Sequence, residues 1–365
     1  MPAVNPKLKC GVKVWQQSYA ELRVGSRFNQ VAIPRNIGST ELLPILNLLD
    51  GSNDLSAICY QSGVNSERLI EIISMLCKFQ LIDTARTPIP YTPRYNSTNR
   101  KIESVTDAET VAGDFALDAF LARCEIESEA LTRVSDVYDG GRQVLLDRKN
   151  FSILIYGSNR ISNSLFGILQ ASGFSPVFAE GTFTPYRSKA MISSSDITGS
   201  TFRNSDIGLH RVKRLNEIRN EYALFPEEKS APEKINLIIC VERPSQEVAQ
   251  YWMSEGIAFI VINAENAGEI SIGPLIRPGN SPCLRCVDLA EKDKGPILIS
   301  NNQVPELSSI MSTFTAAMIA AEVSKFAMTG TSVLYATTLR YSQHHLSEPQ
   351  IERWQTHPNC GCAWK

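Results

Sequence analysis

Two pairs of closely spaced cysteines constrain this chain more than any other feature of its sequence. Cys283 and Cys286 form a CxxC motif, and Cys360 and Cys362 form a CxC motif. A structural zinc ion takes four deprotonated soft ligands in a tetrahedron, and short Cys–Cys loops present sulfur atoms in pairs. The sequence therefore predicts a four-cysteine structural zinc site that ties together two segments far apart in the chain.

Other interpretations of these cysteines are a redox-active CxxC motif and two unrelated pairs. The residues before Cys283, Gly273–Pro282, are rich in Gly and Pro, and we expect a loop there rather than a strand leading into a helix. That expectation disfavours the redox motif, and paired cysteines in an intracellular chain are more often metal ligands than disulfides. His357 could replace one sulfur, but four cysteines already complete the shell, and a closed shell leaves no open position for catalysis.

Length and charge set the broad class. A chain of 365 residues favours two or three domains, and 43% hydrophobic residues are enough for packed cores. The 36 basic and 38 acidic residues nearly balance, which disfavours nucleic acid as a partner. No segment approaches the roughly 18 apolar residues of a membrane helix, and the N-terminus lacks the pattern of a signal peptide. We therefore expect a cytoplasmic protein that binds neither nucleic acid nor membrane.

The pattern of apolar residues divides the chain into three parts. Residues 1–83 predict a winged-helix-like α+β module, residues 84–113 a polar, proline-bearing linker, and residues 114–365 a larger α/β domain. The module shows three strand-like runs followed by three helical patterns. These segments are Val12–Gln17, Ala20–Val24, Phe28–Ile33, and helices beginning near Ser39, Asp54 and Ser66.

The larger domain begins with a buried-strand pattern, Phe151–Tyr156, followed by Gly157 and a helix. Alternating apolar strands and helices predict a mostly parallel, doubly wound sheet. In a nucleotide-binding domain the first strand leads into a GxGxxG loop. Here Asn159 and Ser162 stand where the second and third glycines belong. We therefore expect no ATP binding, although a degenerate loop can still hold a phosphate at a helix start.

Several motifs in residues 150–365 occur together and in order. They are the strand–loop–helix at 151–172, Ser205-Asp206-Ile207-Gly208 with Arg211, the run Gly273–Gly279, Pro-Cys-Leu-x-Cys-x-Asp-Leu ending at Leu289, and His357-Pro358-x-Cys360-x-Cys362. This part resembles the ThiF-like domains related to ubiquitin-activating enzymes. It is most similar to the ThiF-like proteins of thiazole/oxazole-modified peptide (bacteriocin) biosynthesis.

Active ThiF-like enzymes adenylate a carboxylate with a glycine loop, an arginine and acidic residues, often with a later catalytic cysteine. This chain lacks two of the glycines and has no cysteine between Cys286 and Cys360. The resemblance thus implies a non-adenylating member, and we assign no catalytic residue.

The order of elements in the N-terminal module is similar to the peptide-recognition element of ribosomal peptide biosynthesis, the fold of the PqqD peptide chaperone. The resemblance implies that a leader peptide adds as a strand beside Phe28–Ile33 and faces the helix Ser66–Phe79. The candidate lining residues are Asn29, Val31, Ile33, Arg68, Ile72 and Met75. The alternative is that the apolar ones belong to the core, because strand and helix each also bury one face.

A winged helix can also bind DNA. The helix Ser66–Phe79 carries two basic residues, Arg68 and Lys78, and two acidic ones, Glu67 and Glu71. It therefore lacks the basic stripe of a DNA-recognition helix. DNA binding is therefore disfavoured.

Three functions fit these observations. The first is a non-catalytic partner that binds the leader of a precursor peptide and delivers it to a YcaO-type cyclodehydratase, which forms azoline rings. The second is an active ATP-dependent adenylating enzyme acting on a peptide or carrier carboxylate. The third is a docking scaffold without leader affinity. The resemblance also implies a homodimer.

Overall fold

The computed structural model describes most of the chain. The described residues are 5–9, 11–18, 21–26, 29–34, 36–79, 81–83, 123–131, 141–178, 191–222, 234–295 and 306–362. Contacts divide the chain into two compact units, Met1–Asp147 and Arg148–Lys365. The linker predicted at 84–113 lies outside the described residues, so the predicted domain boundaries stay predictions.

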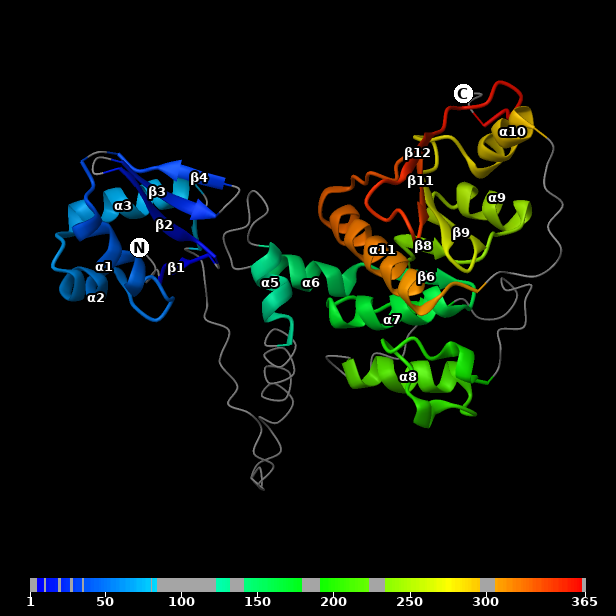
Figure 1. Cartoon of the computed structure of the whole chain (residues 1–365), viewed down its shortest axis with the longest axis horizontal. Helices are drawn as coiled ribbons and strands as arrows, with labels where there is room; N and C mark the ends of the chain where they lie inside the picture. Colours follow the sequence, from blue (N-terminus) through cyan, green and yellow to red (C-terminus); the bar gives the residue numbers. More distant parts are fainter. Residues whose placement is uncertain are drawn as a thin grey trace. The chain divides into compact units, whose positions relative to one another are not determined.

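The first unit contains the three expected strands and three expected helices (Figure 1). The strands are β2 (Lys13–Ser18), β3 (Glu21–Ser26) and β4 (Asn29–Ala32), and the helices are α1 (Ser39–Leu48), α2 (Leu55–Ser62) and α3 (Ser66–Lys78). Among the described residues the sheet is antiparallel with the order β2-β3-β4, so β4 lies at an edge of it. A second small sheet pairs β1 (Lys7–Leu8) with β5 (Ile82–Asp83). That pairing brings the two ends of the module together.

Local signals in the sequence set the helix boundaries of this unit. The side chain of Asp54 caps α2, and the side chain of Asn65 caps α3 by accepting from the Arg68 N–H at 2.8 Å. Leu69, Ile72 and Leu76 are spaced along one face of α3 and are fully buried. They share one core with residues of the sheet and of the other helices, among them Val24, Ile33, Leu42, Ile45 and Ile58.

Two further helices lie between the module and the sheet of the second unit in the chain. They are α5 (Glu125–Leu131) and α6 (Arg142–Asn150). The sequence pattern also predicts a helix from about Phe115 to Tyr138, and the described part of this stretch, 123–131, contains α5. No sequence pattern predicted α6.

The second unit is built on a seven-stranded sheet with the order β12-β11-β10-β9-β8-β6-β7. Its strands are β6 (Ile153–Tyr156), β7 (Val177–Phe178), β8 (Leu237–Cys240), β9 (Ala258–Asn266), β10 (Glu269–Ile276), β11 (Thr337–Ser342) and β12 (Gln350–Arg353). Strands β7, β6, β8 and β9 are parallel, whereas β9 to β12 are antiparallel. The expectation of a mostly parallel sheet is therefore wrong for one half of it.

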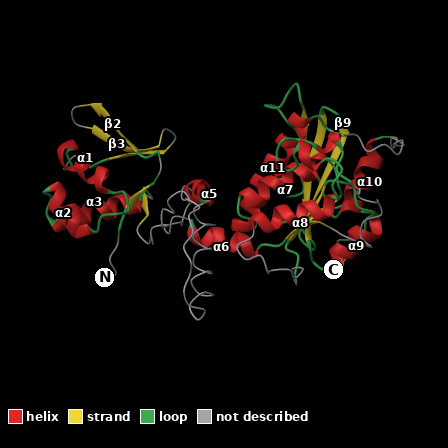
Figure 2. Cartoon of the chain, turned by 90° about the horizontal axis from the view of Figure 1, so that it is seen from below, coloured by secondary structure: helices red, strands yellow, loops and turns green. Residues whose placement is uncertain are grey.

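Helices cover both faces of this sheet (Figure 2). They are α7 (Arg160–Ala171), α9 (Gln246–Ser254), α10 (Leu284–Lys294) and α11 (Ser309–Thr329), and α8 (Arg211–Tyr222) packs on α7. The helices α7 and α11 lie on one face and bury the larger core, which includes Ile155, Leu165 and Ile319. On the other face α9 and α10 cover a second core around Trp252 and Phe259. No helix within the described residues is long and apolar enough to cross a bilayer.

One expected loop is partly a strand. Gly273 and Pro274 lie within β10, at an irregularity in its pairing with β9 between Ile272 and Leu275. A Cβ at Gly273 would lie 2.3 Å from the backbone oxygen of Thr337, so only glycine fits this close approach of β10 and β11. The chain then passes from β10 through a short loop into α10, which begins directly after Cys283. The sequence expectation of a loop throughout 273–282 is thus wrong for its first part.

Candidate functional site

The four predicted zinc ligands come together in the structure. The Sγ atoms of Cys283, Cys286, Cys360 and Cys362 all lie within 4.8 Å of one another. Cys283 is 3.8 Å from Cys286 and 3.3 Å from Cys360, and Cys286 is 3.3 Å from Cys362. The first three are buried and Cys362 is exposed. None of the four forms a disulfide.

This donor set fits a tetrahedral zinc ion. A Zn–S bond of about 2.3 Å places the sulfurs of an ideal tetrahedron about 3.8 Å apart, close to the separations found here. Burial, followed by a hydrogen bond with Cys360, raises the pKa of the Cys283 thiol. Burial also raises the pKa of Cys362, to about 11. Burial acts the same way on Cys286, but hydrogen bonds from the His357 backbone and from Cys362 lower its pKa overall. A bound cation would stabilise all four thiolates.

The two cysteine pairs sit on different structural elements. Cys283 is the N-cap of α10 and Cys286 lies in its first turn. Cys360 and Cys362 follow β12 on a turn in which Gly361 has a φ of +76°. The side chain of His357 is directed elsewhere, with Nε2 at 2.8 Å from the Asp293 carboxylate and Nδ1 accepting from the Asn359 N–H. His357 therefore supports the turn and is outside the four-sulfur cluster.

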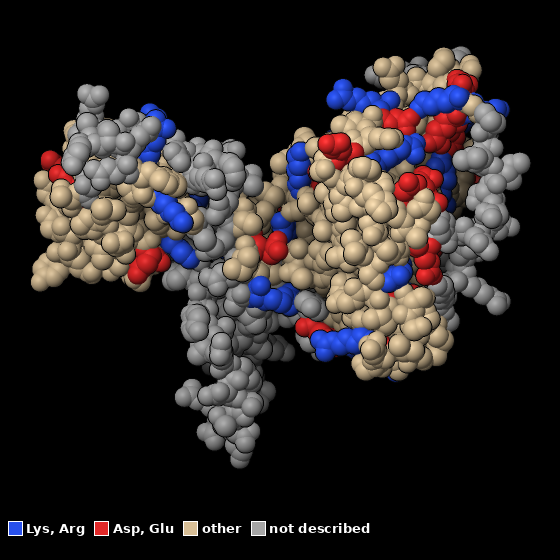
Figure 3. Space-filling model, viewed as in Figure 1, with Lys and Arg blue, Asp and Glu red and all other residues tan. Residues whose placement is uncertain are grey.

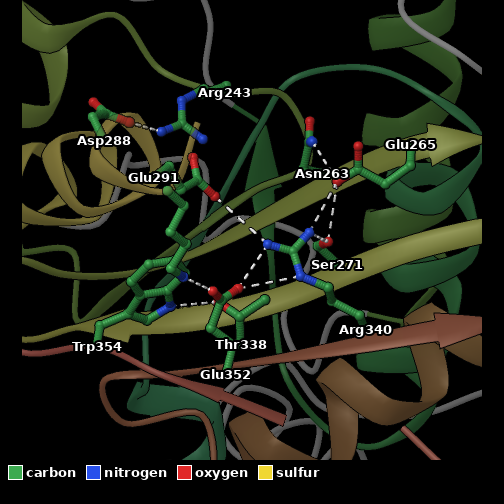
Figure 4. A network of polar contacts seen from close by, with 11 residues as sticks. Arg243, Asn263, Glu265, Ser271, Asp288, Glu291, Thr338, Arg340, Glu352 and Trp354 are labelled. Carbon is green, nitrogen blue, oxygen red and sulfur yellow. Dashed lines mark hydrogen bonds and ion pairs between the residues drawn. The ribbon is translucent and has the colours of Figure 1, made fainter. Parts of the chain in front are cut away.

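A network of polar contacts joins α10 to the antiparallel half of the sheet (Figure 4). Arg340 on β11 pairs with Glu352 at 2.7 Å, donates to Ser271 Oγ at 3.1 Å, and lies 3.6 Å from Glu291 of α10. Lys294 of α10 pairs with Glu352 as well. Burial raises the pKa of Glu352, but the bonds from Lys294 and Arg340 lower it overall. The network aligns the helix that carries one cysteine pair with the strand that precedes the other.

Acidic and basic side chains are interspersed on the visible face of the second unit, and they gather toward the end that carries α10 (Figure 3). The Arg243–Asp288 ion pair also reaches α10. Such a mixture of positive and negative side chains is typical of a solvated surface with local ion pairs. It is not the uniformly positive surface that attracts a polyanion.

The loop between β6 and α7 is where a nucleotide-binding domain would hold phosphate. Gly157 has a φ of +99°, and Asn159 is the N-cap of α7. The Asn159 side chain accepts from the N–H groups of Ile161 and Ser162 at 2.9 and 3.1 Å, and Ser162 Oγ accepts from the Asn159 N–H at 2.9 Å. The two residues that replace glycines thus form a capping box.

A residue that the sequence analysis did not single out completes this loop. Glu242, two residues beyond the end of β8, accepts a hydrogen bond from the Ser158 N–H at 2.9 Å through Oε1. Asn159 Nδ2 donates to the Val241 carbonyl at 2.9 Å. A Cβ at Gly157 would lie 2.8 Å from Cγ of Glu242, so the Glu242 side chain packs directly on this glycine. No local motif reveals Glu242, because its partners lie about 84 positions earlier in the chain.

Arg211, singled out with the Ser-Asp-Ile-Gly motif, is buried rather than available to a ligand. Its side chain is 2% exposed and pairs at 2.7 Å with Asp196, which is 2% exposed too. Arg211 also donates to Asn163 Oδ1 of α7 at 2.8 Å and lies over the Phe202 ring. Burial raises the pKa of Asp196, but the bonds from Arg211 and Ser193 lower it overall. Arg211 therefore fixes the segment 191–211 against α7.

The six candidate peptide-lining residues fall into different environments. Asn29 is the first residue of β4, and Val31, half-buried, lies on the same strand. Ile33 and Ile72 are buried in the module's core, the alternative that the sequence left open. Met75 is half-buried on α3. Arg68 of α3 pairs with Glu41 at 3.1 Å and with Glu71 at 2.6 Å, and it donates to the Asn36 carbonyl.

Comparisons with known proteins place the fold. A scan against protein-family models found no match, and a search of curated proteins found none. Among solved structures, E. coli MccB with MccA in selenomethionine form matches with a TM-score of 0.60 at 14% identity, covering 98% of this chain and 99% of that one. E. coli MccB with ATP matches with a TM-score of 0.57 at 14% identity, with the same coverage. The chain has the fold of MccB.

A structure of PaaA in selenomethionine form shares the fold too. Its TM-score is 0.56 at 16% identity, and the match covers 94% of this chain and 99% of PaaA. A further MccB structure is described as the microcin C7 biosynthetic enzyme in complex with N-formylated MccA. The expected α/β fold with a preceding α+β module is confirmed, because the fold shared with MccB extends over nearly the whole chain.

Proposed function

We propose that this protein is a non-catalytic partner in ribosomal peptide modification. Its N-terminal module binds the leader of a precursor peptide, and the ThiF-like unit brings the bound peptide to a YcaO-type cyclodehydratase that forms azoline rings. Tethering the core peptide at that enzyme raises its effective concentration there. Zinc at the four cysteines serves a structural role. A homodimer is a further part of the proposal.

The observation that carries leader binding is the edge position of β4. The Ile33 N–H donates to the Leu22 carbonyl of β3, and Val31 pairs with Val24 in the same register. In an antiparallel ladder such pairs alternate with residues whose backbone groups point away from the partner strand. Ala32 therefore directs its N–H and C=O to the side of β4 away from β3, where an extended peptide would pair.

Precursor binding by proteins of this fold supports the proposal. MccB has been crystallised with MccA, and that complex shares its fold with this chain. The loop between β6 and α7 supports the non-catalytic part of the proposal, because four of its backbone N–H groups already donate to acceptors within the chain.

The experiment that tests leader binding is fluorescence anisotropy of a labelled leader peptide from a candidate ribosomal precursor, titrated with the full chain. Ala32→Pro removes one outward N–H and leaves the β3–β4 pairs at Val31 and Ile33 in place. Loss of a backbone hydrogen bond corresponds to about a threefold to tenfold weaker Kd. Ala32→Val, which keeps the N–H, is the matched control.

Equal leader affinity of Ala32→Pro and Ala32→Val would rule out strand addition at β4. Unchanged peptide processing by a partner cyclodehydratase after deletion of residues 1–83 would favour the docking scaffold instead. Processing that depends on those residues supports delivery of the peptide.

A second candidate is an adenylating enzyme acting on a peptide or carrier carboxylate. It is favoured by the fold shared with MccB, of which one structure contains ATP. Exchange of labelled pyrophosphate into ATP, dependent on an added peptide, tests it directly. Exchange by the purified chain would establish adenylation and exclude the non-catalytic function.

A further inference from the structure

The loop between β6 and α7 has the geometry of an anion-binding turn. The N–H groups at a helix start and in the turn before it carry partial positive charge and commonly hold phosphate. Here four of them have acceptors within the chain. Ser158 donates to Glu242, Asn159 donates to Ser162 Oγ, and Ile161 and Ser162 donate to the Asn159 side chain.

Only one of these acceptors, the Glu242 carboxylate, carries a charge, and it lies in the segment that follows β8. Glu242 follows β8, which is parallel to β6, so its carboxylate reaches the same end of the sheet as the loop. Its Cβ, Cγ and Cδ would lie 2.8–3.0 Å from a Cβ built on Gly157. The glycine that a phosphate loop keeps for close approach of a ligand is here approached by a glutamate side chain.

The segment that carries Glu242 is held against the loop at a second point. Asn159 Nδ2 donates to the carbonyl of Val241, the residue directly before Glu242. Val241 is buried, and its N–H donates to the Tyr156 carbonyl at 2.9 Å. The backbone of Glu242 is therefore fixed within reach of Ser158, and little conformational entropy is lost when its carboxylate binds there.

We propose that Glu242 is an internal ligand of this loop, a carboxylate that takes the place of a phosphate group and closes the site to nucleotides. An entering phosphate would have to displace a tethered carboxylate from the Ser158 N–H and would meet a charge of its own sign. This inference rests on the non-catalytic part of the proposed function and names Glu242 as the residue that keeps nucleotides out. It is independent of leader binding by the N-terminal module.

The test compares the full chain with two variants in isothermal titration calorimetry. Glu242→Ala removes the carboxylate and uncovers Gly157, and it is expected to bind inorganic phosphate and Mg·ATP at least about tenfold more tightly than the unaltered protein. Glu242→Gln keeps the length of the side chain and an acceptor for Ser158 but removes the charge, and it is expected to gain clearly less affinity than Glu242→Ala. Leader affinity, measured on the same samples, should be equal in all three proteins.

Three results would overturn the inference. They are saturable ATP binding by the unaltered protein, no gain in Glu242→Ala, and an equal gain in Glu242→Gln. Absence of leader binding by the unaltered protein would instead contradict the proposed function. It would not affect the conclusion about Glu242 and the β6–α7 loop.

A second measurement covers the case in which Glu242→Ala does not fold. Hydrogen exchange of the unaltered protein should show slow exchange at the Ser158 amide that millimolar Mg·ATP does not change. Slower exchange of this amide on addition of Mg·ATP would show the nucleotide at the loop and refute the internal ligand.

Discussion

The Sγ atoms of Cys283 and Cys360 lie 3.3 Å apart although 77 positions separate them in the chain. Their supporting elements meet independently of any metal. Lys294 of α10 pairs with Glu352 of β12, and its Nζ lies 4.5 Å from the centre of the Trp354 ring. Trp354 Nε1 in turn donates to Thr338 Oγ1 of β11 at 2.8 Å. The packed structure thus aligns both halves of the cysteine cluster.

We expect about one zinc ion per chain, and we expect its removal to loosen the second unit without unfolding it. Cys360→Ser or a chelator should cost a few kcal/mol, which corresponds to a fall of roughly 5–15 °C in the melting temperature for a unit of this size. Elemental analysis and calorimetry measure both quantities. Cys59→Ser, in the first unit, is the control and should leave the metal content unchanged.

A zinc content far below one per chain, with the four thiols reactive in the native protein, would contradict this prediction. Leader affinity should survive Cys360→Ser, because the β4 edge belongs to the other unit.

The buried pair of Asp196 and Arg211 should make stability depend on pH in acid. Asp196→Asn leaves a buried guanidinium without its counter-charge and should cost about 3–5 kcal/mol at neutral pH. The folded-state pKa of Asp196 is lowered below its ordinary value of 3.8. Its stabilising contribution is therefore complete above pH 3.8 and is lost as the pH falls through the lower folded value.

The measurement is chemical denaturation of the unaltered protein and of Asp196→Asn over a series of pH values. The stability difference should be constant from neutral pH to about pH 5 and shrink below pH 4. A difference that persists undiminished at the lowest pH would show that the carboxylate charge is not what stabilises the unit.

We expect Arg68 to position the proposed leader-binding strand β4, because its side chain holds α3 to the segment after β4. It reaches the Asn36 carbonyl and Glu41 at once, and a lysine cannot reproduce this fork of donors. Arg68→Lys should weaken leader binding severalfold in the anisotropy titration. Lys78→Ala, at an exposed position of the same helix, is the matched control. Identical affinities would show that Arg68 has no part in the leader site.

Short-range patterns predicted the parts of the fold that depend on neighbouring residues. The spacing of cysteines within each pair and the helix starts near Asp54 and Ser66 are all local, and each is present. The antiparallel direction of β10 was missed because this strand is as apolar as the parallel strands. Ile270, Ile272 and Leu275 are buried, and a buried strand does not reveal the direction of its neighbours.

The contents of the β6–α7 loop could not be predicted for a different reason. The loss of two glycines indicated a degenerate loop, but what fills it comes from Glu242, far along the chain. The sequence also left open whether Ile33 and Ile72 belong to the core or line the peptide site. The answer depends on which face of α3 meets the sheet. Tertiary contacts decide both questions.

Gly167 provides a test in which local preference and packing oppose each other. It lies within α7, where alanine would favour the helix by about 1 kcal/mol. A Cβ at this position would lie 2.5 Å from Thr201 Oγ1 and 2.9 Å from the backbone oxygen of Ser200. Because the backbone oxygen cannot rotate away, Gly167→Ala should destabilise the second unit by about 1–3 kcal/mol. Denaturant titration measures this, and the double variant with Thr201→Ala should recover only part of the loss. A more stable Gly167→Ala protein would mean that the segment 191–211 does not pack on α7 as described.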